Sequence, residues 1–282
     1  MKKRILSVIL AAAMVMATLT GCGSSSSGAT VTEDTLSKVI TSQKLVVGCI
    51  LTNEPYGSYD DEGNPIGYDV DIAYLLADSL GIPHENVEFL DVSAAERIPA
   101  LESGKCDVVI GNFTIILDRA QKVEFTDPYN AGATGVLTLK GNEIEHATEL
   151  AGKKVAASMG TTNQQSADRL VAAGVDMEVV LTDGTDDLTA LQSGQVDAII
   201  SDVSYAAYIA SKYPEKYSYC VTDYTEMLVE PFYDGFGVKK GDQIWLNYLN
   251  KFIFQINLDG SNAALYEKWL GYPREIPLNP EY

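Results

Sequence analysis

Two stretches of the chain match each other at a spacing of 90 residues. The segment ALESGKCDVVI occupies residues 100–110, and ALQSGQVDAII occupies residues 190–200. Each joins a short helical pattern to an apolar strand, with a glycine between them where a left-handed backbone costs least. A chain that carries this unit twice is expected to fold as two similar lobes.

The repeat extends upstream of both segments. Each copy contains a buried strand, then an amphipathic helix, then a second apolar strand. Alternating strands and helices favour an α/β fold of two Rossmann-like lobes with mostly parallel sheets. The predicted ranges are 44–48, 69–80 and 87–90 in the first copy, and 153–158, 163–173 and 178–181 in the second.

The last part of the chain adds elements outside the repeat. A short strand is predicted at 237–239, followed by amphipathic helices at 242–258 and 261–270. The residues alone do not indicate which lobe these elements join.

The repeat also predicts where a ligand would bind. In open parallel sheets, ligands bind beyond the carboxyl ends of the strands. The matching strands end at Asn112 and Asp202, which hold equivalent positions. Two facing lobes would therefore place these residues in the walls of one cleft.

The N-terminus resembles a bacterial lipoprotein signal. Basic residues 2–4 precede apolar residues 5–18, a run too short for a comfortable transmembrane span. We expect residues 1–21 to be removed and Cys22 to carry lipid, which would place the protein at the cell membrane, facing the extracellular or periplasmic side. Residues 22–43 are expected to form a flexible tether. The alternative is an ordinary signal peptide with an incidental cysteine.

Composition argues against several classes of function. The formal net charge of -19 argues against binding nucleic acid, and we attribute the acidity to solubility. Cys49, Cys106 and Cys220 form no C-x-x-C pair. We interpret Cys49 and Cys106 as small buried thiols, and we expect neither a metal nor another cofactor.

Four stretches of the chain match a known family in their order and spacing: GNPIGYDVDIAYLLADSLG (63–81), DRAQKVEFTDPY (118–129), AGKKVAASMGTT (151–162) and LDGSNAALYEKWLG (258–271). Through them, over residues 44–271, the chain resembles the type II periplasmic solute-binding proteins of the polar amino-acid class, also called bacterial solute-binding protein family 3. The resemblance implies the receptor of an ABC importer, acting as a monomer with a membrane permease as partner. It also implies a two-segment hinge near 129–133 and 231–236. Lobe 1 would then contain 44–131 and 236–282, with the C-terminal helices packed on it, and lobe 2 would contain 132–235.

The resemblance assigns roles to cleft residues that suit a free amino acid. Arg119 would bind the α-carboxylate, since a planar guanidinium meets a carboxylate with two hydrogen bonds. Asp202 would bind the ammonium group. Alternatively, Arg119 is a surface arginine and Asp202 only caps a helix. The assisting groups would be the Thr114 hydroxyl, the Asn112 carbonyl, and an anion site at Gly160, Thr161 and Thr162.

The resemblance indicates less about the ligand's side chain than about its α-carboxylate and ammonium groups. Ile50 and Asn53 stand where many relatives carry an acid and an aromatic residue, which argues against cationic or large aromatic ligands. Relatives that bind acidic amino acids use an arginine at the position of Arg97. The acidic amino acids glutamate and aspartate are therefore our first hypothesis, and a small neutral polar amino acid is the second. Arg97 alternatively pairs with Glu96 or Glu102 on its own helix, and Tyr56 is either an aromatic wall or a core residue.

Two other functions are open to this fold. One is a dehydratase-like enzyme, and the other is a sensor that reports to a signalling partner. The two histidines, His84 and His146, lie in stretches typical of solvated loops. No G-x-S-x-G, HExxH or P-loop motif is present, so we do not expect an enzyme.

Overall fold

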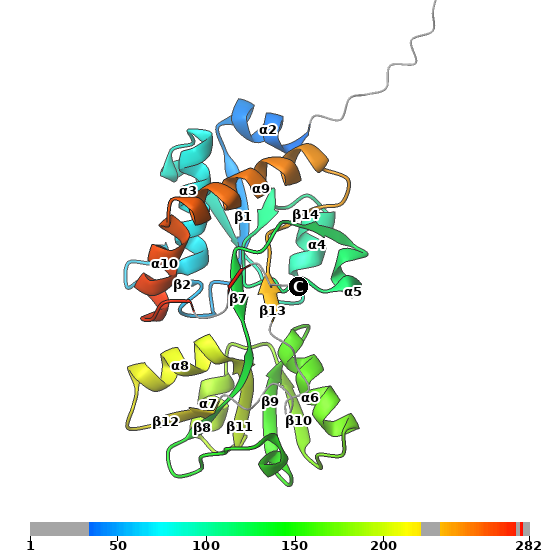
Figure 1. Cartoon of the computed structure of the whole chain (residues 1–282), viewed down its shortest axis with the longest axis vertical. Coiled ribbons are helices and arrows are strands. Elements are labelled where there is room, and N and C mark those ends of the chain that lie inside the picture. Colours follow the sequence, from blue (N-terminus) through cyan, green and yellow to red (C-terminus); the bar gives the residue numbers. More distant parts are fainter. Residues whose placement is uncertain (1–33, 221–231, 275–276, 279–282) are drawn as a thin grey trace, which may run out of the picture. The chain divides into compact units, whose positions relative to one another are not determined.

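Two five-stranded sheets with the same spatial strand order organise the protein (Figure 1). The computed structural model describes residues 34–220, 232–274 and 277–278. All of these belong to one compact unit that begins at Asp34. The first sheet contains, in order, β4 (Val87–Asp91), β1 (Leu45–Cys49), β5 (Val108–Val109), β14 (Gly237–Lys239) and β6 (Val123–Phe125). The second contains β10 (Glu178–Thr182), β9 (Lys154–Ser158), β11 (Ala198–Asp202), β8 (Thr134–Leu139) and β12 (Tyr217–Cys220).

Helices connect the strands of each lobe as the repeat predicted. The residue ranges predicted for strands and helices agree with the observed elements to within one residue at each end. The strand predicted to end at Asn112 is an exception, because β5 ends at Val109. The helices of the first lobe are α3 (Tyr68–Leu80), α4 (Arg97–Glu102) and α5 (Leu117–Ala120); those of the second are α6 (Thr162–Ala172), α7 (Asp187–Gln192) and α8 (Val203–Lys212). The first lobe also has a hairpin of β2 (Ser58–Tyr59) and β3 (Pro65–Ile66) and a 3-10 turn, η1 (His84–Asn86), and the second has η2 (Ala147–Leu150).

The two sheets share one exception to parallel pairing. Strand β1 pairs in parallel with β4 and β5, and β9 pairs in parallel with β10 and β11. The fourth strand of each sheet, β14 or β8, is antiparallel to both of its neighbours. Each of these strands directly follows a segment that crosses between the lobes.

The crossing segments run side by side. Strand β7 (Asn130–Gly132) leads into β8, β13 (Phe232–Asp234) leads into β14, and β7 and β13 pair antiparallel with each other (Figure 1). The predicted fold class, two lobes of mostly parallel sheet joined by two chain segments, is therefore confirmed.

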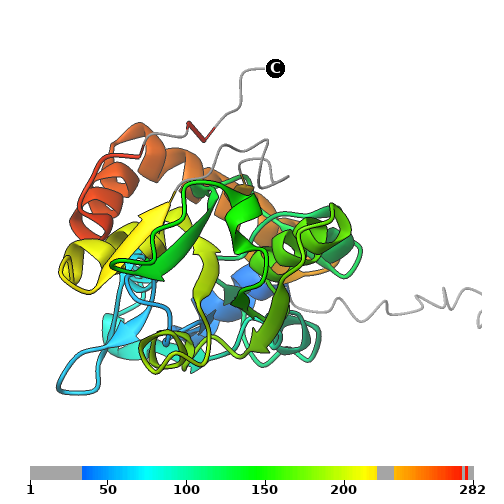
Figure 2. The same cartoon turned by 90° about the horizontal axis from the view of Figure 1, so that it is seen from below.

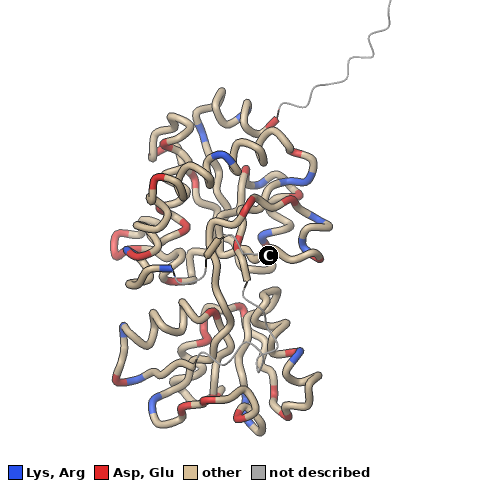
Figure 3. Tube along the Cα trace, in the orientation of Figure 1, with Lys and Arg blue, Asp and Glu red and all other residues tan. Residues whose placement is uncertain are grey.

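The C-terminal helices α9 (Gln243–Leu258) and α10 (Ser261–Leu270) pack on the first lobe. Trp245, Leu249 and Ile253 share one hydrophobic core with Ile72 and Leu76 of α3. The end of α10 also lies beside α8, because residues of both line one groove (Figure 2). Acidic residues are spread over both lobes with basic ones among them, so the charge has no single location (Figure 3).

The aspartate of the repeated motif, which directly precedes β5 or β11, is hydrogen-bonded to the neighbouring strand β1 or β9. The Asp107 side chain accepts a hydrogen bond from the amide of Val46 at 2.9 Å, and its own amide donates to the carbonyl of Val46 at 2.8 Å. Asp197 makes the same pair of bonds with Lys154, at 2.8 and 2.7 Å. The repeat thus requires an aspartate for a structural reason at this position.

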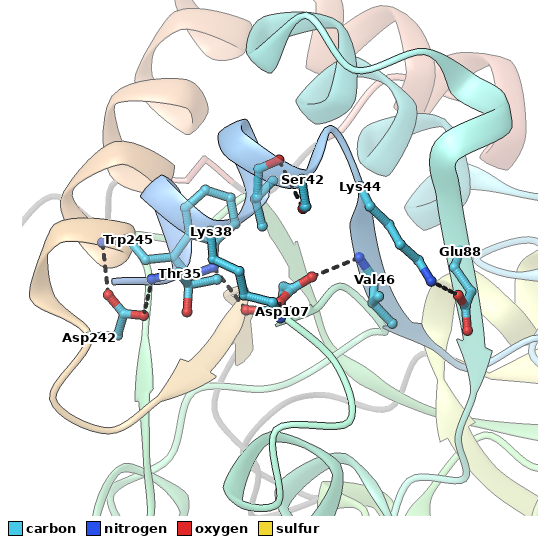
Figure 4. A network of polar contacts seen from close by, with 10 residues as sticks. Thr35, Lys38, Ser42, Lys44, Val46, Glu88, Asp107, Asp242 and Trp245 are labelled. Atoms are coloured by element: carbon cyan, nitrogen blue, oxygen red, sulfur yellow. Dashed lines mark hydrogen bonds and ion pairs between the residues drawn. The ribbon is translucent and has the colours of Figure 1, made fainter. Parts of the chain in front are cut away.

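The structure corrects the predicted tether. Residues 1–33, which include the predicted signal and Cys22, lie outside the described residues. Within the remainder of the predicted tether, α2 (Thr35–Ser42) forms a helix on the first lobe. Asp34 caps it, Val39 is buried, and Lys38 Nζ lies 2.6 Å from the carboxylate of Asp107 (Figure 4). A flexible tether can therefore extend no further than residue 33.

We predict that Asp107→Ala lowers the free energy of unfolding by about 2–3 kcal/mol, since it leaves the partly buried amide of Val46 without its charged acceptor. Asp107 is 7% exposed, whereas the equivalent Asp197 is exposed and has no lysine partner among the described residues. Asp197→Ala is the matched control and should cost less than half as much. Urea denaturation measures both, and equal losses would contradict this account.

Candidate functional site

A cavity of about 100 Å³ lies where the two lobes face each other. Its walls are the connections that follow β1, β4 and β5 in the first lobe and β9, β10 and β11 in the second. This is where an open parallel sheet binds its ligands. Seven of the eight predicted binding residues line it: Arg97, Asn112, Thr114, Arg119, Thr161, Thr162 and Asp202.

Arg119 is a buried cation in the wall of the cavity. The residue is 7% exposed, so the surface alternative is wrong. Its Nη1 donates to the carbonyl of Thr114 at 2.7 Å, and Nη2 donates across the lobes to the carbonyl of Gly160 at 3.0 Å. Burial lowers the pKa of Arg119, and the charges of Asp234 and Asp202 raise it. A guanidinium has five N–H donors, so Arg119 retains donors for an anion.

Asp202 is the buried anion of the same cavity. It occupies the residue before α8, but its side chain makes no capping bond, so the capping alternative is wrong. Instead it accepts from Nδ2 of Asn112 at 2.6 Å and from Nδ2 of Asn163 at 3.1 Å. Burial raises the pKa of Asp202, while the two amides and both arginines lower it. Its carboxylate is held in place by donors from both lobes.

Arg97 is held by backbone oxygens. Its Nε donates to the carbonyl of Ala94 at 3.0 Å, and Nη1 donates to those of Gly111 at 3.0 Å and Asn112 at 2.6 Å. Burial and the nearby charge of Arg119 lower the pKa of Arg97 to about 9. The alternative, that Arg97 pairs with Glu96 or Glu102 on the surface, is wrong. The Asn112 carbonyl, expected to accept from the ligand, instead accepts from Arg97.

The predicted anion site at the start of α6 is only partly available. The amide of Gly160 donates to Oε1 of Gln164 at 2.9 Å. The Thr161 hydroxyl caps α6 by accepting from the Gln164 amide and donates to the Ser158 carbonyl at 2.6 Å. The backbone amides of Thr161 and Thr162 make no hydrogen bond within the described part of the chain. These two amides, not the hydroxyl of Thr161, can face an anion.

Tyr56 is a core residue and not a wall of the cavity. It is 1% exposed and meets the ring of Tyr68 edge to face, with centroids 6.1 Å apart. Its hydroxyl lies 2.6 Å from that of Ser204 on α8, so it links the two lobes. The structure therefore supports the core alternative that the sequence left open.

The cavity is also lined by residues that the sequence argument did not propose, among them Ser158, Asn163, Asp183, Asp187 and Tyr205. The repeat held the signal for one of them. Asp187 stands 90 residues after Arg97, and the two residues begin the equivalent helices α7 and α4. The 90-residue repeat that relates Asn112 to Asp202 therefore also relates Arg97 to Asp187.

Neither histidine belongs to the site. His84 stacks on Tyr74, with ring centroids 4.4 Å apart, and bonds to Asp78 at 2.9 Å. His146 is exposed. Cys49 and Cys106 are buried free thiols, as predicted. Among the described residues no group of His, Cys, Asp or Glu is arranged to hold a metal, and no helix could span a membrane.

Two more carboxyl groups are buried outside the cavity. Asp69 accepts from the Tyr129 hydroxyl at 2.7 Å and from the Asn112 amide at 2.9 Å. Asp234, on the crossing strand β13, accepts from Nδ2 of Asn130 at 2.9 Å. Burial raises the pKa of each to about 7, and the charge of Asp202 adds to the effect on Asp234.

Comparison with known proteins identifies relatives along nearly the whole chain. A family model described as bacterial extracellular solute-binding proteins, family 3, matches residues 45–173 and 163–272. The ABC transporter glutamine-binding protein GlnH of Bacillus subtilis (strain 168) is 28% identical over 274 residues, covering 95% of this chain and 97% of the relative. The L-cystine-binding protein TcyJ of Escherichia coli (strain K12) is 32% identical over 244 residues, covering 85% and 87%.

A solved structure shares the fold. The ancestral amino acid-binding protein AncCDT-1, described as a precursor of cyclohexadienyl dehydratase, superposes with a TM-score of 0.74 at 30% identity. The match covers 84% of this chain and 100% of that protein.

We predict that the protein becomes less stable between pH 5 and pH 8. Asp69 and Asp234 bind a proton more tightly when folded, because their pKa rises from 3.8 to about 7. Their contribution to stability is complete below about pH 4 and is lost as the pH rises through about 7. In Asp234→Asn, the free energy of unfolding should fall between pH 5 and pH 8 by at least about 1 kcal/mol less than in wild type. Denaturation at both pH values tests this, and equal falls in wild type and variant would contradict it.

Proposed function

The chain belongs to the bacterial extracellular solute-binding proteins of family 3, and from this premise we propose that it binds one free amino acid between its lobes. It then delivers the amino acid to the permease of an ABC transporter. The proposal rests above all on the buried pair Arg119 and Asp202, which line one cavity from opposite lobes.

This pair matches the two charges of a free amino acid. A carboxylate can take the remaining donors of Arg119 and the amides of Thr161 and Thr162. An ammonium group can donate to Asp202, whose carboxylate already faces the cavity. Burial makes each charge costly without a partner, so a ligand that pairs both offsets two desolvation penalties at once. A ligand with only one of the charges would leave the other without a partner.

Delivery requires the lobes to separate and close, and the structure offers the parts for this motion. In the described part of the chain, β7 and β13 pair along the crossing, and side-chain contacts join the lobes elsewhere. These contacts join Asn112 to Asp202, Arg119 to Gly160, Tyr56 to Ser204, and Lys212 to Glu54 at 2.9 Å. A two-segment hinge with a polar interface favours closure around a ligand.

The observations favour binding over catalysis. The two relatives carry the names of binding proteins, and both histidines lie outside the cavity. The fold neighbour described as a dehydratase precursor is itself named an amino acid-binding protein. Product formation from candidate acids would be the sign of an enzyme.

The acidic ligand expected from Arg97 has weaker support. Nε and Nη1 of Arg97 already donate to three carbonyl oxygens, which leaves only Nη2 for a second carboxylate. Relatives are named for glutamine, for cystine and for glutamate/aspartate, so their names do not separate neutral ligands from acidic ones. A neutral polar ligand is therefore favoured over glutamate or aspartate on the evidence of this residue.

We predict that Arg119→Ala abolishes amino-acid binding in a protein that still folds. Removing one partner of a buried charge pair costs roughly 2–5 kcal/mol, or at least about 30-fold in affinity. Calorimetry of the mature protein against the common amino acids measures the loss, and circular dichroism checks the fold. Arg169→Ala, which removes an exposed arginine of α6, is the control and should bind normally. Undiminished affinity in folded Arg119→Ala would refute the assignment.

We further propose that the mature protein is held at the membrane through lipid on Cys22, which lies outside the described residues. Cys22→Ser should release the protein to the soluble fraction or leave its precursor uncut, since acyl chains supply the membrane affinity. Cell fractionation and mass spectrometry measure this. Cys220→Ser is the control and should remain attached. A wild-type protein that is soluble and carries no lipid would exclude the anchor.

A further inference from the structure

We propose that Asp187 is the residue that recognises the ligand's side chain, and that the ligand is an amino acid whose side chain carries N–H donors. This chemistry belongs to the amides glutamine and asparagine and to the cations arginine and lysine. The inference rests on the proposed function and adds a substrate class to it.

Asp187 is an acceptor with half of its capacity unused. The residue lines the cavity and is only 5% exposed. Oδ2 accepts from the Ser158 hydroxyl at 3.3 Å, but Oδ1 is buried and has no partner among the described residues. A buried carboxylate oxygen without a donor is costly, and the residue that carries it lines the cavity, so a donor on the ligand would complete its hydrogen bonding.

Asp187 lies apart from the pair that would bind the α-carboxylate and α-ammonium groups. The charges that act on it are those of Asp183 and Asp186, whereas Asp202 is influenced by Arg97 and Arg119. Asp187 follows β10 at the edge of the sheet, and Asp202 ends β11 near its middle. Asp187 is thus available to a part of the ligand other than the groups bound by Arg119 and Asp202.

The surroundings of Asp187 favour a donor over a second carboxylate. Burial raises the pKa of Asp187, Asp183 and Asp186 add to this, and the hydroxyls of Thr182 and Ser158 lower it. Asp183 also lines the cavity. A glutamate side chain placed here would meet two acidic groups, while an amide or a cation would complete the hydrogen bonding of Oδ1.

This placement also answers the sequence argument against cationic ligands. That argument rested on Ile50, which lacks the acid found there in many relatives. Asp187 supplies an acid to the same cavity from the opposite lobe. The loss of one acid at Ile50 therefore does not remove negative charge from the site.

Calorimetry of the mature protein with glutamine, asparagine, arginine, lysine, glutamate and serine tests the inference. Wild type should bind at least one of the first four about tenfold or more tightly than glutamate and serine. Asp187→Leu should lower the affinity for that ligand by roughly 10- to 150-fold, which is the effect of losing a hydrogen bond to a charged group. Asp186→Asn removes an exposed neighbouring charge outside the cavity wall and should change affinity less than about threefold.

Asp187→Asn distinguishes amide ligands from cationic ligands, and it provides the test if Asp187→Leu does not fold. It keeps an acceptor oxygen but loses the charge, so an amide ligand should bind nearly normally and a cation should bind as poorly as to Asp187→Leu. Preferential binding of glutamate or serine, with affinity unchanged in both variants, would overturn the role of Asp187 while the Arg119 result still stands. If no amino acid binds wild type, the proposed function fails as well.

Discussion

Two guanidinium groups share one phenyl ring at the centre of this protein. Arg97 and Arg119 lie 4.4 and 5.2 Å from the ring centroid of Phe113, and their mutual repulsion is one reason why the pKa of Arg97 falls. The carbonyls of Gly111, Asn112 and Thr114 hold these charges in place of water. The loop after β5 must therefore keep one conformation, and the geometry of the cavity depends on it.

The repeated architecture could be predicted from the sequence because its signals are local. Apolar periodicity and glycine stops predict strands and helices to within one residue, and Asn112 and Asp202 follow from the repeat register. The ring of Tyr56 and the carbonyl contacts of Arg97 depend on how distant segments pack, which no local pattern encodes. Helix α2 was missed because its stability comes from Asp107 and Asp242, far along the chain.

The two lobes show how one backbone plan can serve opposite charges. Arg97 and Asp187 begin equivalent helices, and Asn112 and Asp202 hold equivalent repeat positions, after β5 and at the end of β11. The shared aspartates Asp107 and Asp197 keep their structural role in both copies. The aspartate with a structural role is thus the same in both lobes, whereas the residues that face the cavity differ. The cavity wall from the first lobe is rich in cations, and the wall from the second lobe is rich in anions.

The position of β14 in the first sheet also has a consequence for biogenesis. The second sheet is made from residues 134–220 alone, so a growing chain can complete it without waiting for later sequence. The first sheet contains β14 between β5 and β6, and its core includes residues of α9 and α10. That lobe stays divided until nearly the whole chain has been made. A premature stop before residue 237 would consequently remove an interior strand of the first lobe and not a dispensable tail.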